Sequence, residues 1–249
     1  MDELNKKIFS YYKNYYQKQL ELPNWRDRVN FRLNEEKLER EKIRRLEKIL
    51  GKFSGKKILD VGCGTGGFLV EAKRKRANVI GLEPERQAVE ICLAKGLKDI
   101  KQGKGENLPY HGHYFDIVYC YTVLEHTENP EKVISEMVRV TKKNGKIYIH
   151  TPNYLSFYEG HYKIFWLPAM PKFLAKIYLA ARGRPTKFIE TINYLTPQKL
   201  KQLFEKLPVE IAWIKHQLGK PTNFLEQIIF LYYKFFKIDP QIEVIIQKI

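Results

Sequence analysis

The stretch from residue 57 to residue 153 alternates between short apolar runs and segments with helical spacing. This alternation limits the possible folds more than any other feature. The last helical segment, NPEKVISEMVRVTKKNG (129–145), is expected to end at Gly145. Such alternation predicts a parallel sheet covered by helices on both faces, with ligands at the carboxyl ends of the strands. The apolar runs are KKILDV, ANVIGLEP, DIKQG, FDIVYCY and KIYIHTPN.

The regions outside this stretch have different patterns. Residues 1–54 are expected to form an N-terminal helical cap, with a break at ELPNW and a long charged helix ending at Leu50. Residues 55–249 are expected to form the main domain. Two aromatic, aliphatic and basic segments, at about 154–190 and 218–238, predict helical insertions within it. Between and after these segments, VEIAWIK and QIEVIIQKI read as strands.

Charge and cysteine content restrict the environment and the partners. The formal net charge is +16 and the pI is near 9.6, which favours anionic partners such as nucleic acid or an acidic membrane face. The same charge also fits an ion-paired exterior, because Lys and Arg alternate with Glu in NEEKLEREKIRRLEK. Three cysteines without metal spacing predict free thiols in a reducing cytoplasm. No export signal or membrane span is expected.

The loop after the first strand, ILDVGCGTGG, carries the strongest ligand signal. Its glycines fit both GxGxxG and GxGxG spacing, so the glycines alone do not identify the ligand. Asp60 ends the strand two residues before Gly62. A carboxylate there would repel a dinucleotide pyrophosphate, whereas it would attract a cationic ligand. S-adenosylmethionine has a sulfonium, an ammonium and no phosphate, and it fits this charge.

The second strand ends in an acid that suits the ribose of the same ligand. Glu83 follows Gly62 by 21 residues, about the separation expected for a carboxylate that binds ribose hydroxyls.

In ILDVGCGTG, VIGLEP, GENLPY, FDIVYCYTVLEH and VRVTKKNGKIYIHTPN, the sequence resembles the class I S-adenosylmethionine-dependent methyltransferases, of the small-molecule type that includes the ubiquinone/menaquinone methyltransferases. The resemblance covers about residues 56–153. It implies a Rossmann-like three-layer α/β sandwich whose seven-stranded, mostly parallel sheet has an antiparallel last strand. It also implies methyl transfer from S-adenosylmethionine, with S-adenosylhomocysteine as the product.

The resemblance also assigns roles to individual residues. The glycine loop would surround the methionyl end, Glu83 and Pro84 would lie at the ribose, and the loop 106–108 would line the adenine. The implied cofactor-binding residues are Asp60, Gly62, Cys63, Gly64, Thr65, Gly66, Glu83, Pro84, Glu106, Asn107, Leu108, Cys120 and Tyr121.

One position departs from the family pattern. The family's adenine loop commonly reads Gly-Asp-Ala-Glu before Leu-Pro, and its Asp accepts a hydrogen bond from the adenine amino group. Here the loop reads GKGENLPY, with Lys104 at the Asp position, and a lysine cannot accept that bond. Either Glu106 or a backbone carbonyl replaces it, or adenine is held more loosely.

Three histidines are candidates for a general base, which methyl transfer needs only if the acceptor keeps its proton. His126 follows the fourth strand on the expected substrate side and is the predicted base. His150 lies within a strand and is expected to pack. Tyr158 and His161 lie in the irregular segment and are predicted substrate residues. His111 and His113 lack a third ligand nearby, so no metal site is predicted.

The acceptor is only partly defined by the sequence. CYTVLEH replaces the Asn/Asp-Pro-Pro-Tyr motif of many amino-methylating enzymes, so O- or C-methylation of a small or lipid-like acceptor is favoured. Three alternatives remain: methylation of RNA or protein, which the basic charge favours; a nicotinamide-dependent oxidoreductase; and a non-catalytic module that keeps the fold, which only Lys104 favours. The insertions predict a peripheral membrane contact, or else ordinary core and dimer helices. The expected location is therefore cytoplasmic, with or without membrane association.

Overall fold

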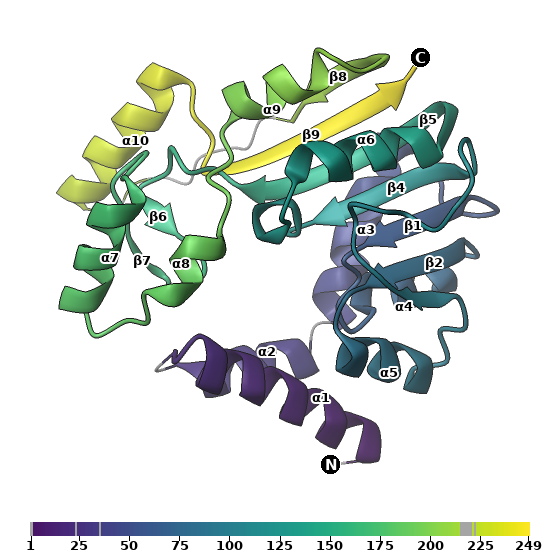
Figure 1. Ribbon diagram of the computed structural model, residues 1–249, viewed down its shortest axis with the longest axis horizontal. Coiled ribbons are helices and arrows are strands. Elements are labelled where there is room, and N and C mark those ends of the chain that lie inside the picture. The colour runs from purple at the N-terminus through teal and green to yellow at the C-terminus, as the bar shows by residue number, and fades with distance from the viewer. Residues whose placement is uncertain (1, 23, 35, 215–220, 222) are drawn as a thin grey trace.

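A computed structural model describes residues 2–22, 24–34, 36–214, 221 and 223–249. Its centre is a seven-stranded sheet of order β3-β2-β1-β4-β5-β9-β8 (Figure 1). β9 runs antiparallel to both of its neighbours, whereas β1 to β5 pair in parallel. The predicted α/β fold with an antiparallel last strand is confirmed. The strands are β1 (Lys57–Val61), β2 (Asn78–Glu83), β3 (Ile100–Gln102), β4 (Phe115–Tyr121), β5 (Thr141–Pro152), β8 (Val209–Trp213) and β9 (Gln241–Lys248).

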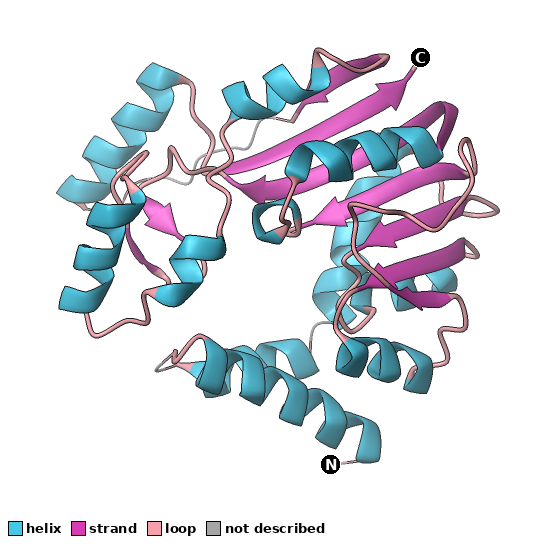
Figure 2. Cartoon of the chain, viewed as in Figure 1, coloured by secondary structure: helices cyan, strands magenta, loops and turns pink. Residues whose placement is uncertain are grey.

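Helices cover both faces of the sheet because its strands are apolar on both sides (Figure 2). In β4, Val118 and Cys120 pack in the core under α6 and α9, whereas Ile117 and Tyr119 pack in the core under α3 and α4. α5 follows β2, and its Cys92 belongs to the second of these cores. The helices are α3 (Glu36–Leu50), α4 (Gly67–Arg74), α5 (Arg86–Ala94), α6 (Pro130–Val140) and α9 (Pro197–Phe204).

The N-terminal helices form a small core of their own. α1 (Glu3–Lys13) continues as the π-helical turn η1 (Asn14–Gln19), and α2 (Trp25–Leu33) packs against both. This core reaches the sheet domain at Ile91 of α5. α3 differs from them, because its Ile43 and Leu46 are fully buried in the core of the sheet.

One predicted helix end is wrong. α6 ends at Val140 instead of Gly145, and β5 already begins at Thr141. The Thr141 hydroxyl donates to the Met137 carbonyl at 2.6 Å, which satisfies the last turn while the Thr141 backbone is extended. Gly145 then lies so close to this corner that a Cβ would be 2.7 Å from Thr141 Cγ2. Sequence patterning missed the boundary because the charged residues that follow Thr141 suit either state.

The two insertions form a separate lobe, at the left of Figure 1. The first is not entirely helical: a hairpin of β6 (Tyr158–Glu159) and β7 (Ile164–Phe165) precedes α7 (Lys172–Ala181) and α8 (Lys187–Thr191). The second contains α10 (Phe224–Phe236), and residues 215–220 and 222 before it lie outside the described part. The first insertion has its own core, which includes Trp166 and Leu179. Among the described residues, no helix has the length and apolarity to cross a membrane.

Candidate active site

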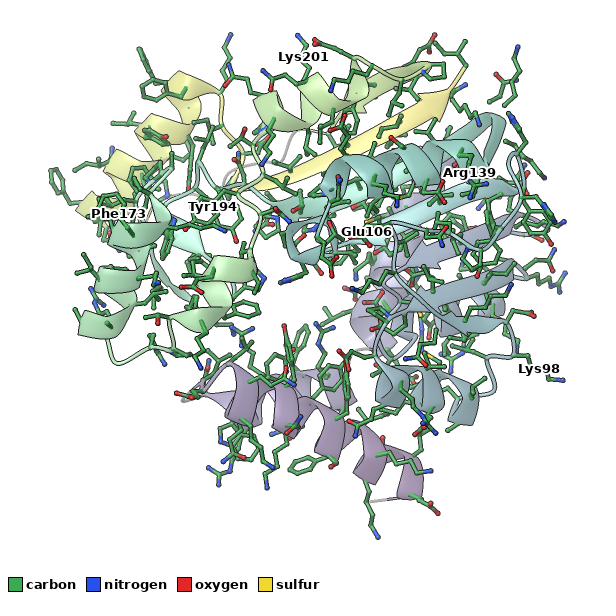
Figure 3. The ribbon with its side chains drawn as sticks, in the orientation of Figure 1. Lys98, Glu106, Arg139, Phe173, Tyr194 and Lys201 are labelled. Carbon is green, nitrogen blue, oxygen red and sulfur yellow. The ribbon has the colours of Figure 1, made fainter. Side chains whose placement is uncertain are left out.

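A cavity of about 740 Å³ lies at the carboxyl ends of β1, β2 and β4. The N-terminal helices, the turn after β4, the ends of β5 and β9, and the hairpin loop of the first insertion contribute further parts of its wall. In Figure 3, side chains of the sheet domain, the N-terminal helices and the insertion lobe point toward this central region. The cavity therefore has a sheet end, formed by the glycine loop, and an insertion end, formed by the turn after β4 and the hairpin loop.

The glycine loop reverses tightly against the turn that follows β4. Gly62 has φ +72°, and a Cβ there would lie 2.4 Å from Val123 Cγ2. The Gly62 and Cys63 amides both donate to the Leu82 carbonyl, at 2.8 and 3.1 Å. Only glycine combines this backbone conformation with so close an approach. The loop is therefore fixed to β2 and to the β4 turn at the same point.

The Glu83 carboxylate connects the ends of β1 and β2. Its Oε2 accepts from the Gly64 amide at 2.8 Å, and its Oε1 accepts from the Glu85 amide at 3.0 Å. Burial raises the pKa of Glu83, and these two amides oppose the rise. Each carboxylate oxygen has a further lone pair, so Glu83 can still accept from a ligand hydroxyl.

Asp60 is a buried carboxylate that borders the cavity. Burial and the neighbouring Glu39 raise its pKa well above the usual range, and Lys42 only partly offsets them. Lys42 is itself engaged by Glu39, with Nζ 2.6 Å from Oε1. A cationic ligand group beside Asp60 would therefore be favoured, because it would supply the charge that the protein leaves uncompensated.

The N-terminal helices contribute residues that the sequence analysis did not select. The Tyr12 hydroxyl lies 3.0 Å from Thr65 Oγ1 in the glycine loop. Arg28 Nη2 donates to the carbonyls of Gly160 and His161, at 3.3 and 3.2 Å. These contacts join segments 53 to 133 residues apart, so no local pattern could have indicated them. Arg32 also borders the cavity and is a further cation that could meet an anionic ligand group.

The predicted residues fall into two groups by position. Those that line the cavity are Asp60, Gly62, Cys63, Gly64, Thr65, Glu83, Pro84, Tyr121, His126 and His161. Those outside the lining are Gly66, Glu106, Asn107, Leu108, Cys120 and Tyr158. Of these, Gly66 is the N-cap of α4, Cys120 and Leu108 are core residues, and Tyr158 is half exposed.

The loop expected at the adenine is held by side chains of its own neighbourhood. The Glu106 carboxylate accepts from the amides of Glu128 and Asn129, at 2.9 and 3.3 Å. Lys104, at the family's Asp position, pairs with Glu128 at 2.5 Å and lies in solvent. Glu106 is thus occupied as a turn-stabilising acceptor, and the expected substitution of Glu106 for the missing Asp stays a prediction.

Four polar residues meet at the insertion end. Glu125 and His126 lie on the 3₁₀ turn η2 (Leu124–His126), and His161 lies on the hairpin loop. The Nε2 atoms of His126 and His161 are 3.1 Å apart, and His161 Nδ1 is 2.7 Å from Glu159 Oε1. Burial raises the pKa of Glu125 to about 7. Burial and His161 lower the pKa of His126, which makes it neutral but weakly basic.

The remaining histidines lie apart from this group. His150 stacks on Tyr121 with ring centroids 4.2 Å apart and borders the cavity. His111 and His113 are exposed on the loop before β4, and neither lines the cavity.

Comparisons with known proteins place this arrangement in a family. Residues 59–149, which run from β1 to β5, match the Methyltransf_11 family, a methyltransferase domain. An uncharacterized protein of Methanocaldococcus jannaschii is 31% identical over 149 residues, covering 60% of this chain and 62% of that protein. The ubiquinone biosynthesis O-methyltransferase of Citrobacter koseri is 32% identical over 110 residues, 41% of this chain and 45% of that enzyme. The chain thus matches about half the length of these relatives.

A solved structure extends the likeness in fold. The Thermotoga maritima SAM-dependent methyltransferase, described as a possible histamine N-methyltransferase, has a TM-score of 0.57 and 19% identity, covering 97% of this chain and 98% of that one. At that identity the likeness concerns the fold alone. The family match and the strand order carry the expected family: residues 59–149 belong to a class I S-adenosylmethionine-dependent methyltransferase domain.

Proposed function

We propose that the protein transfers the methyl group of S-adenosylmethionine to an oxygen or carbon atom of a small or lipid-like acceptor. The observation that carries the proposal is one continuous cavity, which is bordered by Asp60 and Glu83 at one end and by His126 and His161 at the other. A cationic nucleoside and the acceptor would thus share one cavity. Family membership supports the cofactor, and the relatives named ubiquinone biosynthesis O-methyltransferases support the acceptor class.

The residues divide the work of binding. Asp60 would meet the ammonium of the methionyl group, and Glu83 would accept from the ribose hydroxyls while it holds the Gly64 amide. Arg32 would offer a cation for the methionyl carboxylate. The glycine loop then brings the sulfonium to the turn that carries Thr122 and Val123, beside the insertion end.

For an oxygen acceptor, the reaction is an in-line displacement. The acceptor oxygen forms a bond to the methyl carbon, the carbon–sulfur bond breaks, and its electron pair stays on sulfur as neutral S-adenosylhomocysteine. The hydroxyl proton leaves at the insertion end; His126 is the acceptor that the sequence predicts, and its lowered pKa makes it a weak one. The protein contributes mainly alignment and exclusion of water, because the sulfonium is already activated.

The exposed apolar surface of the insertions supports a lipid-like acceptor. α7 contacts β7, where the Tyr178 hydroxyl donates to the Phe165 carbonyl, and α10 contacts the same insertion through Tyr232 and Phe157. Phe173, at the outer side of the lobe in Figure 3, is 64% exposed, and Phe235 of α10 is 79% exposed. The exposed apolar residues of the two helices are Phe173, Leu174, Ile177, Phe224, Leu225, Ile228, Leu231, Phe235 and Phe236.

The charge on this surface favours an anionic bilayer as its partner. Lys172 on α7, Lys234 on α10 and Lys237 just after α10 are exposed among the apolar residues, the pattern of an interfacial helix. Flotation with vesicles containing acidic lipid should recover the protein, and Phe173→Glu with Phe235→Glu should abolish recovery. Leu93→Glu, at a half-exposed apolar residue of α5, is the control. Recovery that persists in the double variant would contradict the membrane contact.

The acceptor class is tested by following the methyl group. Purified protein is incubated with methyl-labelled S-adenosylmethionine and separate lipid, small-molecule, RNA and protein fractions. Label should enter the lipid or small-molecule fraction, and Asp60→Asn should prevent this. Label in RNA or protein would favour the alternative that the net charge suggested.

A further inference from the structure

One carboxylate oxygen at the insertion end lacks the partner that its burial demands. The Glu125 side chain is fully buried, and its Oε2 accepts from Thr151 Oγ1 at 3.0 Å. Its Oε1 has no hydrogen-bond partner among the described residues. A buried carboxylate oxygen without a donor is costly, so this position calls for a cation or a proton.

Two imidazole nitrogens face the same point. His126 Nε2 is 3.9 Å from Glu125 Oε1 and 3.1 Å from His161 Nε2. If both nitrogens bound one ion at about 2.1 Å, their 3.1 Å separation would correspond to an angle of roughly 90° at the ion. The three ligand atoms all lie within 4.8 Å of one another. Small side-chain rotations would therefore bring them to coordination distance.

Glu159 fixes the ring of His161 in the state that a metal requires. Its Oε1 is 2.7 Å from His161 Nδ1, and its Oε2 accepts from the Tyr162 amide at 2.7 Å. A carboxylate at Nδ1 keeps the proton there and leaves the Nε2 lone pair free to bind an ion. This arrangement of carboxylate, histidine and ligand position is the usual support of metal-bound histidines.

We infer that Glu125, His126 and His161 form a binding site for a divalent transition metal ion such as Zn²⁺. Two imidazoles and one carboxylate are a ligand set that suits zinc and leaves a coordination position open. All three residues line the cavity, so that position would face the acceptor. There the ion would bind a hydroxyl oxygen of the acceptor and lower the pKa of that hydroxyl. This use of the ion rests on the proposed function, whereas binding of the ion does not.

These ligands come from separate segments, so no local spacing in the sequence indicates the site. His111 and His113, the histidine pair that is local in sequence, are exposed on another loop. His126 and His161 are 35 residues apart, and only the fold of the hairpin brings them together.

The test is titration of the full, untagged and metal-stripped chain with Co²⁺, a spectroscopic substitute for Zn²⁺. One equivalent should produce visible absorption of a nitrogen- and oxygen-ligated ion, and Zn²⁺ should displace it. His161→Ala should weaken binding about 100-fold or more, and Glu159→Gln about 10- to 100-fold. His111→Ala, at an exposed histidine outside the cluster, should bind as the wild type does.

Binding of S-adenosylhomocysteine to each variant shows that it is folded and separates the two proposals. Wild-type protein that binds S-adenosylhomocysteine but shows no Co²⁺ spectrum would overturn the metal site and leave the proposed function standing. Equal Co²⁺ affinity in the wild type and His161→Ala would overturn it as well. Protein that binds Co²⁺ as expected but does not bind S-adenosylhomocysteine would support the site and contradict the proposed function.

Discussion

The sheet end of the cavity is held mainly by backbone amides, whereas the insertion end is held by side chains that contact one another. Glu83 accepts from two amides, and the Gly62 amide donates to the neighbouring strand. At the other end, Glu159, His161 and His126 form a chain of side-chain contacts across an inserted hairpin. A backbone-built site depends on a short continuous motif. A site built from side chains depends on how distant segments fold. A change in the insertion can therefore alter the insertion end and leave the sheet end as it is.

Substitution of Gly62 should have the largest effect, because Gly62 lies at the sheet end and packs against the turn that forms part of the insertion end. Gly62→Ala places a Cβ 2.4 Å from Val123 Cγ2 at a φ of +72°. We expect a loss of about 3 kcal/mol or more in the free energy of unfolding, and loss of S-adenosylhomocysteine binding. Gly64→Ala is the matched control, since its φ is +53° but no atom lies within 4 Å. That variant should lose only about 1 kcal/mol. Equal losses in urea unfolding would contradict the importance of the close contact.

Loss of the hydrogen bonds that hold the hairpin loop should affect the insertion end and leave the sheet end unchanged. Arg28→Met removes the hydrogen bonds to the carbonyls of Gly160 and His161 but keeps most of the side-chain volume. Methyl transfer to the acceptor should fall about tenfold because the loop is less well positioned, while S-adenosylhomocysteine affinity should change by less than about twofold. Arg26→Met, on the same helix, is the control. A large loss of cofactor affinity would show that the two ends are not separable.

The smallest effect should come from a substitution at the contact that holds the loop 104–110. This effect on the free energy of unfolding should depend on pH. The Arg139 guanidinium lowers the pKa of Glu136, which also accepts from the Leu108 amide at 2.8 Å. A lowered folded-state pKa gives stability that is present at neutral pH and is lost as pH falls through that pKa. Glu136→Gln should cost about 1–2 kcal/mol at pH 7, and the difference from wild type should shrink below about pH 4.

Urea unfolding at several pH values measures this difference. Glu128→Gln is the control, because Glu128 also has a lowered pKa but pairs with Lys104 in solvent. Exposed pairs contribute little, so its unfolding curve should barely move. A Glu136→Gln difference that stays constant with pH would contradict the role given to the ion pair.

The contrast between the two ends also explains what the sequence could predict. The ends of β1 and β2 carry Asp60, Gly62 and Glu83. These strands are recognised from short stretches of sequence, and their parallel pairing places the two ends side by side. The seven-stranded, mostly parallel sheet with an antiparallel last strand came from the family resemblance and is confirmed. Contacts such as Tyr12 with Thr65 depend on packing between distant segments, which no window of sequence contains. The early start of β5 at Thr141 was missed for a local reason, because the charged residues that follow Thr141 suit either a helix or a strand.

The most direct test of the central claim is calorimetric titration of S-adenosylhomocysteine into the wild type and Asp60→Asn. The wild type should bind one equivalent in the micromolar range. The variant should bind about 10- to 100-fold more weakly, because the amide keeps the shape but loses the charge that faces the ammonium. Absence of binding by the wild type, with NADH or NADPH bound in parallel titrations, would contradict the claim and identify the glycine loop as a dinucleotide site.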